Sequence, residues 1–262
     1  MNTLQTWSVA LPLLLAMAVG AWAVATARRN AGLVDIVWSL FFLAAALAYA
    51  LGGGREEEAL GPRAWLVLAL VAPWALRLSV YLALRNWHAP EDHRYRAIRA
   101  RNEPGFAWKS LYLVFGLQAL LAWLIAAPLA AAIASGGALG ALDMAGAALA
   151  AFGIAFEATA DAQLAAFKAQ PASAGQVMDR GLWRYTRHPN YFGEFCVAWG
   201  LWLVALAAGA WWTVFAPLLM SVLLLRVSGV ALLEKDIGER RPGYRDYAAR
   251  TNAFFPGPSR SP

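Results

Sequence analysis

The sequence predicts an all-α, polytopic membrane protein with seven transmembrane helices, its N-terminus outside and its C-terminus in the cytoplasm. The first observation is composition: 60% of the 262 residues are hydrophobic and 15% are charged. Soluble domains are about 45–50% apolar and about 25% charged. The second observation is a series of long apolar runs, and the third is the uneven distribution of Lys and Arg between the loops. We therefore expect one integral membrane domain.

A bilayer span needs about 20 mostly apolar residues. Runs of this kind occupy residues 7–27, 33–51, 64–85, 109–134, 140–160, 193–209 and 211–233. The charges of the first run follow its apolar part, which is the wrong order for a cleaved signal peptide, so we expect a retained helix.

The loop charges predict the topology. Lys and Arg gather in 85–109, in 161–192 and in the tail from 235, whereas the alternate loops hold few of them. The positive-inside rule places the basic segments in the cytoplasm. The net charge of +6 is then explained without a nucleic-acid partner. One face collects the polar groups, which favours an enzyme that handles a charged cofactor and a lipid-soluble substrate over a channel.

Three ionisable residues share one face at the end of the fifth run. Glu157, Asp161 and Lys168 are spaced by four and seven residues, which is helical spacing. Ionisable groups at membrane depth are costly and usually face an interior or a cavity. These residues therefore predict the wall of a ligand site, the alternative being a solvated helix end with an ordinary surface pair.

The segment "RYTRHPNYFGE", residues 184–194, concentrates polar groups between apolar flanks. Pro189 suits the first turn of a helix, which places Asn190 at the helix start and Glu194 one turn further. Basic side chains precede this start: Arg180, Arg184, Arg187 and His188. Cations before a helix N-terminus form an anion site. The alternative is a juxtamembrane anchor for lipid headgroups, which does not explain Asn190 and Glu194.

Polar residues of the first half supply further candidates. Asp35 lies in the second run, and an intramembrane carboxylate is a functional candidate; a helix cap or a pairing with Arg77 is the structural alternative. Trp74 shares a helix face with Arg77. The following loop adds Asn86, Glu91, Asp92, Arg94 and Tyr95.

The tail adds Glu234 and Lys235, then Tyr244 and Tyr247 one helical turn apart. We interpret it as a lid over the anion site, the alternative being an amphipathic surface helix. No Walker A, G-x-G-x-x-G or G-x-S-x-G motif occurs, and one Cys and three His without zinc spacing predict no metal site.

Four motifs resemble the steroid 5α-reductase family, in which the chain looks like a bacterial member. The longest is "GLWRYTRHPNYFGEFCVAWGLWL", and the others are "E-x-x-x-D-x-Q" at 157–163, an "R-x-P-G-Y-x-x-Y" run that ends at Tyr247, and "T-x-x-F-x-P" at 251–256. The "E-D-H-R-Y" at 91–95 is similar too.

This resemblance implies a seven-helix reductase of the bacterial inner membrane that uses NADPH to saturate a carbon–carbon double bond conjugated to a ketone. The implied substrate is a lipid-soluble 3-oxo-Δ4 steroid or a related enone. Residues 1–140 then form the substrate side and 141–262 the cytoplasm-facing cofactor side. We expect membrane lipid as a partner and no protein partner.

The resemblance also implies residue roles. Asp161, Asn190 and Glu194 match cofactor-contacting positions, and Lys168 stands where family members can carry Arg. The expected cofactor-binding set is Asn86, Arg94, Tyr95, Glu157, Asp161, Lys168, Arg180, Arg184, Tyr185, Arg187, His188, Asn190, Tyr191, Glu194, Lys235, Tyr244 and Tyr247. The expected catalytic set is Asp35, Trp74 and Glu91.

The sequence departs from the family in two places. Animal members carry a Gln-Glu pair where Val34-Asp35 stands, and a Tyr where Trp74 stands. Since an indole cannot act as a Tyr-like acid, we expect Asp35, protonated in an apolar site, to hydrogen-bond the developing oxyanion.

Two other functions stay open. Isoprenylcysteine membrane methyltransferases share an "R-H-P-x-Y" run and use S-adenosylmethionine, but Glu157, Asp161 and Asp35 favour the reductase. A non-enzymatic lipid-binding protein would keep its charges outside the spans, which Asp35, Glu157 and Glu194 do not do.

Overall fold

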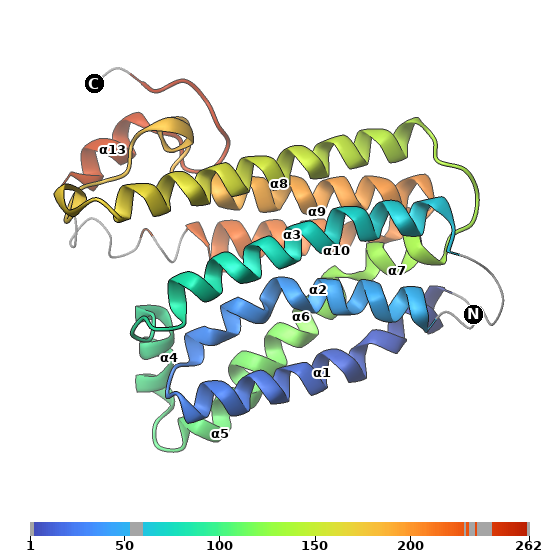
Figure 1. The fold of residues 1–262 in the computed structure, drawn as a ribbon, viewed down its shortest axis with the longest axis horizontal. Coiled ribbons are helices and arrows are strands. Elements are labelled where there is room, and N and C mark those ends of the chain that lie inside the picture. The colour runs from blue at the N-terminus through green and yellow to red at the C-terminus, as the bar shows by residue number, and fades with distance from the viewer. Residues whose placement is uncertain (1–2, 53–59, 228, 231–233, 235–242, 261–262) are drawn as a thin grey trace. The chain divides into compact units, whose positions relative to one another are not determined.

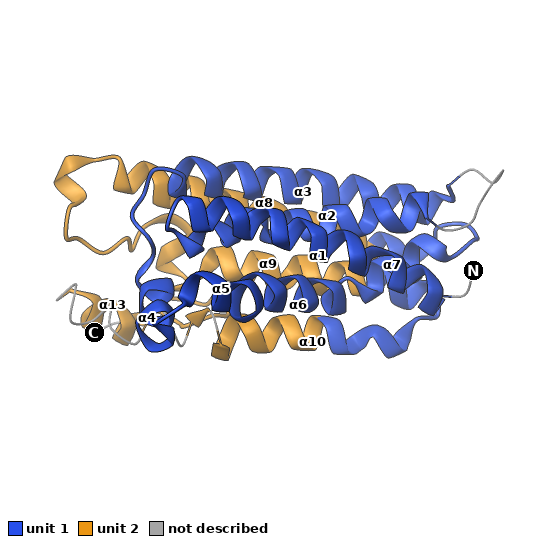
Figure 2. Ribbon diagram, turned by 90° about the horizontal axis from the view of Figure 1, so that it is seen from below, with its two compact units in different colours: residues 1–144, 203–216 blue, residues 145–202, 217–262 orange. Residues whose placement is uncertain are grey.

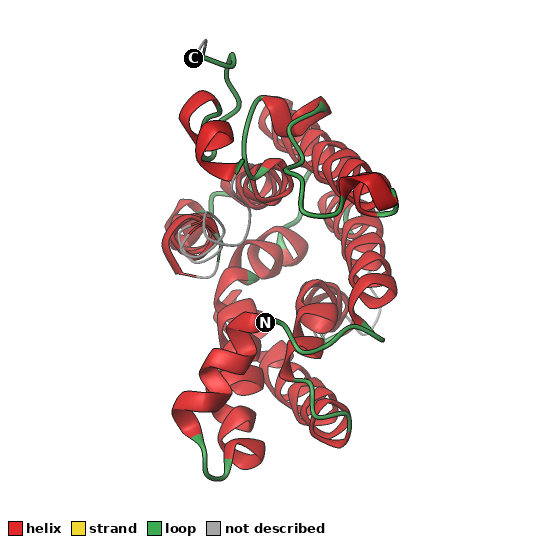
Figure 3. Ribbon diagram, turned by 90° about the vertical axis from the view of Figure 1, so that its left-hand side faces the viewer, coloured by secondary structure: helices red, strands yellow, loops and turns green. Residues whose placement is uncertain are grey.

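The computed structural model describes residues 3–52, 60–227, 229–230, 234 and 243–260. All regular structure in these ranges is helical, and none of the residues described there forms a strand (Figure 3). The protein is therefore an all-α membrane protein, as the composition predicted.

In the described ranges, six helices are long and apolar enough to cross a membrane (Figure 1). They are α1 (Thr3–Ala27), the run Ala31–Leu51 formed by η1 (Ala31–Leu33) and α2 (Val34–Leu51), α3 (Pro62–Asn86), the run Phe106–Ile125, α8 (Ala141–Lys168) and α9 (Pro189–Ala207). The expected seventh span corresponds to the shorter apolar run Trp211–Val227, made of η5 (Trp211–Val214), α10 (Phe215–Val222) and η6 (Leu223–Val227). A count of seven and the orientation of the termini stay predictions.

The chain divides into two compact units, coloured separately in Figure 2. Unit 1 comprises residues 1–144 and 203–216, and unit 2 comprises residues 145–202 and 217–262. The sequence suggested a division after residue 140. The structural division also falls within helices, because α8, α9 and α10 each contribute residues to both units.

Helix α2 lies at the centre of unit 1, where it contacts α1, α3, α6 (Leu117–Ile125) and α7 (Ala127–Ala134). Fully buried alanines on these helices, such as Ala46 and Ala122, allow close approach. Trp7 of α1 and Trp123 of α6 stack at 4.4 Å, and each indole donates a 2.9 Å hydrogen bond to the other's carbonyl. These contacts fix α1 against α6.

The expected fourth span, 109–134, is not one continuous helix. It consists of α5 (Phe106–Ser110), the π-helical turn η2 (Leu111–Gly116), α6 and α7. Pro128 stands in the first turn of α7, where proline is tolerated because no intrahelical bond needs its missing N–H. The apolar run hides this break, since alanine and leucine fill both sides of it.

Arg63 forms a buried clamp at the start of α3. Its Nε lies 2.7 Å from Oδ1 of Asp143 on α8, and its Nη1 donates to the Ser135 hydroxyl at 2.9 Å and to the Gly136 carbonyl. Arg63 is 5% exposed and Asp143 is 1% exposed. By sequence, Arg63 stands directly before the apolar run 64–85, at the position of a loop charge. It is instead a structural residue, because its charge is matched inside unit 1.

Glycines bring α8 and α9 into close contact in unit 2. A Cβ atom on Gly153 would lie 2.5 Å from the Gly193 carbonyl oxygen, and one on Gly200 would lie 2.5 Å from the Ala150 nitrogen. Helix α8 runs to Lys168, further than the expected end at 160, so Asp161 lies within the helix. Shorter elements complete the fold: α4 (His93–Asn102) in unit 1, and η3 (Pro171–Ser173), η4 (Gly181–Arg184) and α13 (Tyr244–Arg250) in unit 2.

Candidate functional site

Unit 2 contains three buried carboxylates on two adjacent helices. Glu157 and Asp161 on α8 are 2% and 3% exposed, and Glu194 on α9 is 8% exposed. A Cβ atom on Gly193 would lie 2.7 Å from Cβ of Glu157, so the backbone beside Glu194 runs against Glu157. Buried carboxylates cost free energy unless polar partners surround them. These helices therefore carry a polar wall inside apolar segments.

The loop around η4 rests on the last turns of α8. The Trp183 indole donates to the Ala160 carbonyl at 3.0 Å, and the Leu182 N–H donates to the Gln163 side chain at 2.9 Å. Arg180 and Arg184 flank this turn, and both are exposed. The contacts place two cations beside the α8 segment that carries Asp161. Lys168, also exposed, ends the same helix.

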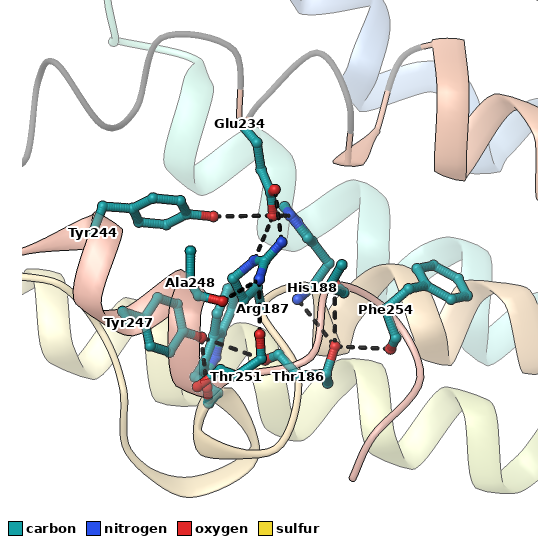
Figure 4. A network of polar contacts seen from close by, with 11 residues as sticks. Thr186, Arg187, His188, Glu234, Tyr244, Tyr247, Ala248, Thr251 and Phe254 are labelled. Atoms are coloured by element: carbon teal, nitrogen blue, oxygen red, sulfur yellow. Dashed lines mark hydrogen bonds and ion pairs between the residues drawn. The ribbon is translucent and has the colours of Figure 1, made fainter. Parts of the chain in front are cut away.

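Arg187 fastens the end of the chain (Figure 4). Its Nε and Nη2 donate to the two oxygens of Glu234 at 2.7 and 2.8 Å, and its Nη1 donates to the carbonyls of Ala248 and Thr251 at 2.9 and 2.7 Å. We expected Arg187 to contact the cofactor. Because four donors of the guanidinium are directed at the chain itself, Arg187 holds the end of the chain in place.

Glu234 collects three partners. Besides Arg187, the His188 ring nitrogen Nε2 lies 2.9 Å from it and the Tyr244 hydroxyl donates at 3.1 Å. Burial by itself raises the pKa of Glu234, but hydrogen bonds from His188 and Arg187 and their charges outweigh it and lower the pKa to about 2. Burial, followed by the negative charge of Glu234, raises the pKa of Tyr244. The carboxylate is therefore held as an anion.

The tail runs back along residues 183–187. The Tyr247 hydroxyl donates to the Trp183 carbonyl at 2.5 Å, and the Thr186 hydroxyl donates to the Phe254 carbonyl at 2.8 Å. The Arg187 N–H donates to the Asn252 carbonyl at 2.9 Å. These bonds explain why "R-x-P-G-Y-x-x-Y" and "T-x-x-F-x-P" accompany the "RYTRHP" segment. They support a cover over this loop, which is where the sequence placed a lid.

Pro189 begins α9, as the sequence predicted, so Asn190 lies in its first turn and Glu194 one turn further. Tyr191 stacks on the His188 ring with centroids 5.7 Å apart. Tyr185 is 46% exposed. Lys235 lies outside the described residues.

Unit 1 has its own polar cluster where α2 begins. Arg94 Nη2 lies 3.0 Å from Oδ2 of Asp35, and the Tyr95 hydroxyl donates to Oδ1 of Asp35 at 2.5 Å. Gln118 donates to the Tyr95 hydroxyl at 3.3 Å. We expected a protonated Asp35 in apolar surroundings. Arg94 and Tyr95 instead place polar partners on the two oxygens of this carboxylate.

The other catalytic expectations have structural partners in unit 1. Glu91 accepts from the Ala31 N–H at 2.7 Å and from Arg99 at 2.8 Å. Burial raises the pKa of Glu91, but these bonds and the charge of Arg99 outweigh it and leave the pKa lowered. Trp74 is 2% exposed and meets the edge of Phe42 at 5.5 Å. Both residues thus belong to the packing of unit 1.

Two residues of the site escaped the sequence analysis as site members. Glu234 was named only as part of the tail, outside the expected site sets, and Gln118 was not singled out. A lone amide within the apolar run 109–134 was the available signal for Gln118. Asn86 accepts a bond from its neighbour Arg85 at 2.8 Å. Among the residues whose placement is described, no group of His, Cys, Asp and Glu is arranged to hold a metal.

Comparison with known proteins assigns a family. The model of the family described as "Protein of unknown function (DUF1295)" matches residues 21–251, so the chain belongs to this family. An uncharacterized protein of Schizosaccharomyces pombe is 27% identical over 275 residues, covering 93% of this chain and 78% of the relative. No solved structure matches.

Proposed function

We propose that this DUF1295 protein is an NADPH-dependent membrane reductase that saturates the double bond of a lipid-soluble enone, with 3-oxo-Δ4 steroids as one substrate class. One observation carries the proposal: unit 2 combines buried carboxylates, Glu157, Asp161 and Glu194, with exposed arginines on a loop that rests on the same helix. Such a division suits a ligand with a charged end and a polar, uncharged end.

The residues of unit 2 fit NADPH. Its phosphates need cations, which Arg180, Arg184 and Lys168 supply, and arginine suits phosphate through paired hydrogen bonds. Its ribose and carboxamide groups need acceptors, which Asp161 and Glu194 supply. When bound, NADPH supplies a hydride to the β-carbon of the enone.

The polar cluster of unit 1 holds a hydroxyl in its protonated form. Burial and the nearby charge of Asp35 raise the pKa of Tyr95 well above its ordinary value, so its hydroxyl stays protonated at neutral pH. Asp35 and Gln118 fix that hydroxyl in place. Asp35 is therefore a positioning residue for Tyr95.

The test is NADPH consumption by protein in lipid, with progesterone, testosterone and other enones, and identification of the product by mass. We expect the product to gain two hydrogens for each NADPH consumed. No consumption with any enone and no binding of NADPH would overturn the proposal.

Binding measurements test the division of labour in unit 2. Arg184→Gln should weaken NADPH about tenfold at low salt and less at high salt, because the contact is electrostatic. Asp161→Asn should weaken NADPH to a similar extent at every salt concentration. Arg260→Gln is the matched control, since it removes an exposed arginine elsewhere in unit 2. Equal effects of Arg184→Gln and the control would contradict the assignment.

The methyltransferase alternative predicts stabilisation by S-adenosylmethionine and not by NADPH. S-adenosylmethionine has no phosphate and a single carboxylate, so it offers fewer anionic groups than NADPH to the cations of the η4 loop. A thermal-shift comparison of NADPH, NADH and S-adenosylmethionine separates the two enzymes. A protein that responds to none of them but binds lipid would support the non-enzymatic alternative.

The proposal places the η4 loop and the tail on the cytoplasmic side of a bacterial inner membrane, where NADPH is present. Seven spans with the N-terminus outside would give this arrangement. Reporter fusions at the two termini measure it, and a C-terminal reporter active only outside the cytoplasm would contradict it.

A further inference from the structure

Three of the long apolar helices of unit 1 have one terminus at the same end of the unit. Helix α1 ends at Ala27, α3 ends at Asn86 and the run Phe106–Ile125 begins at Phe106. Figure 1 shows these ends at the same side of the unit, together with α4. Because spans end where the hydrocarbon ends, residues here lie at the depth of lipid headgroups.

This end is rich in arginines that have no acidic partner. Within the described part of the chain, none of its exposed arginines forms an ion pair with a carboxylate: Arg28, Arg29, Arg85, Arg96 and Arg101. The neighbouring Arg94 and Arg99 are paired with Asp35 and Glu91. Of the nearby acidic side chains, Asp35, Glu91 and Asp92 are paired with Arg94 or Arg99, and the exposed arginines outnumber the remaining Glu103, so this surface has a net positive charge.

The arginines after α1 are held in place. Arg28 donates to the Trp87 carbonyl at 3.0 Å, and its Cζ lies 4.4 Å from the centroid of the Trp87 ring. Arg29 has φ of 52°, a left-handed conformation that non-glycine residues adopt at a cost. Arg99 donates to its carbonyl at 3.5 Å. Two adjacent cations are therefore presented on a fixed turn.

Apolar and aromatic groups surround these cations. Trp87 is 40% exposed, Trp108 is 70% exposed and Leu84 is 82% exposed. Trp22 donates to the Ala107 carbonyl at 2.7 Å and packs against Trp108 at 5.0 Å. Tryptophan prefers the headgroup level because its ring is apolar and its N–H is polar.

We propose that this arginine–tryptophan face, formed by Arg28, Arg29, Arg85, Trp87 and Trp108, binds the phosphate of an anionic phospholipid. The cations match the charge of the headgroup, and Leu84 and Trp108 lie against its acyl chains. A soluble phosphate compound would match the arginines but has no apolar part for these exposed groups. The face belongs to unit 1 and does not depend on the function proposed above.

Native mass spectrometry of purified protein tests the site with phosphatidylglycerol and phosphatidylcholine in separate titrations. We expect wild type to retain phosphatidylglycerol preferentially. Arg28→Gln with Arg29→Gln should lower its affinity about ten- to thirtyfold, since each arginine near an anionic surface contributes about fivefold. The control pair Arg245→Gln with Arg260→Gln, both exposed residues of unit 2, should keep the wild-type preference. Equal retention of both lipids by wild type, or an unchanged preference in the first pair, overturns the proposal.

Further arms guard against misfolding and against a soluble ligand. Arg28→Lys with Arg29→Lys keeps the charge and loses the stacked guanidinium, so it should retain the preference with weaker affinity. If the double glutamine variant unfolds in phosphatidylcholine, the proposal is tested with the double lysine variant and with a salt titration of the wild-type protein. A wild-type preference for phosphatidylglycerol that does not weaken with salt contradicts the site. Displacement of phosphatidylglycerol by inorganic phosphate or by NADPH would assign the face to a soluble phosphate compound and overturn the proposal.

Discussion

Each unit contains an arginine that bonds a carboxylate which also accepts from a tyrosine hydroxyl, but the two networks hold different parts of the chain. In unit 1, Arg94 joins Asp35 at the start of α2 to Asp92, which caps Arg94's own helix. In unit 2, Arg187 joins Glu234 and the carbonyls of Ala248 and Thr251, so it fastens the last segment of the chain. The same chemistry orients a helix start in one unit and closes the chain end in the other.

This comparison also separates structural from available cations. Arg94 and Arg187 are occupied by the protein's own acceptors, whereas Arg28 and Arg29 in unit 1 and Arg180 and Arg184 in unit 2 are exposed. Ligand binding is therefore expected from arginines one or two turns away from each network. An arginine that belongs to a recognisable motif does not necessarily contact the ligand.

The largest effect is expected for Arg63, which marks the deepest ion pair of unit 1. Arg63→Ala should destabilise the protein by about 3–5 kcal/mol, because it leaves Asp143 buried without its cation. Thermal unfolding in detergent measures this loss. Arg63→Ala combined with Asp143→Ala should be less harmful than the single change, and a double variant as unstable as the sum of both would contradict the coupling.

Arg187→Ala should cost less, about 2–3 kcal/mol, since its pair with Glu234 is only partly buried. The loss should appear mainly as release of residues 243–260, seen as faster proteolysis of the tail. Arg187→Lys keeps the charge but not the paired hydrogen bonds, so its rate of tail proteolysis should lie between those of the wild type and Arg187→Ala. Unchanged proteolysis of the tail in Arg187→Ala would refute its positioning role.

Acid should weaken the network of unit 2 specifically. The pKa of Glu234 in the folded protein, about 2, lies below its ordinary value of 4.5. The ionised carboxylate therefore contributes stability that is fully present above about pH 4.5 and is lost as the pH falls through about 2. Tail proteolysis followed from pH 6 to pH 3 by an acid-tolerant protease measures the loss. Glu234→Gln should remove this dependence, and an identical pH profile in that variant would exclude Glu234 as its source.

The smallest effect is expected for the ion pair between Arg250 and Asp179, which joins the tail to the η4 loop at 2.6 Å. Its side chains are 42% and 37% exposed, and exposed pairs contribute about 0–1 kcal/mol. Arg250→Ala should lower the melting temperature by only about a degree or two more than the control Arg245→Ala. A shift as large as that of Arg187→Ala would show that this pair also holds the tail.

The sequence predicted much of the fold because apolar length is a local property. Three of the seven expected runs fall entirely within single long helices or helical runs, and two more, 140–160 and 193–209, extend only one or two residues beyond one. Pro189 begins α9 where its fixed φ favoured a helix start. The break at Ala126 was missed, because alanine and leucine occur on both sides of it. The spacing of Tyr244 and Tyr247 correctly indicated a helical turn in the tail.

For the candidate site, the sequence placed Glu157, Asp161 and Glu194 inside apolar helices, and the structure buries all three. It did not separate the two arginines of the "RYTRHP" segment into Arg187, which is bonded internally, and Arg184, which is exposed. That difference depends on Glu234, which stands 47 residues after Arg187, and no local pattern reports such a pairing.

By itself, the sequence determined the class of protein and the depth of its polar groups, because hydropathy and helical spacing act between near neighbours along the chain. Only the tertiary structure decided which charges are matched. Arg63 meets Asp143, Asp35 meets Arg94 and Arg187 meets Glu234 across separations of 80, 59 and 47 residues. A buried charge in an apolar protein is tolerated only beside a partner of opposite charge. The position of that partner is set by packing between elements that are distant in the chain.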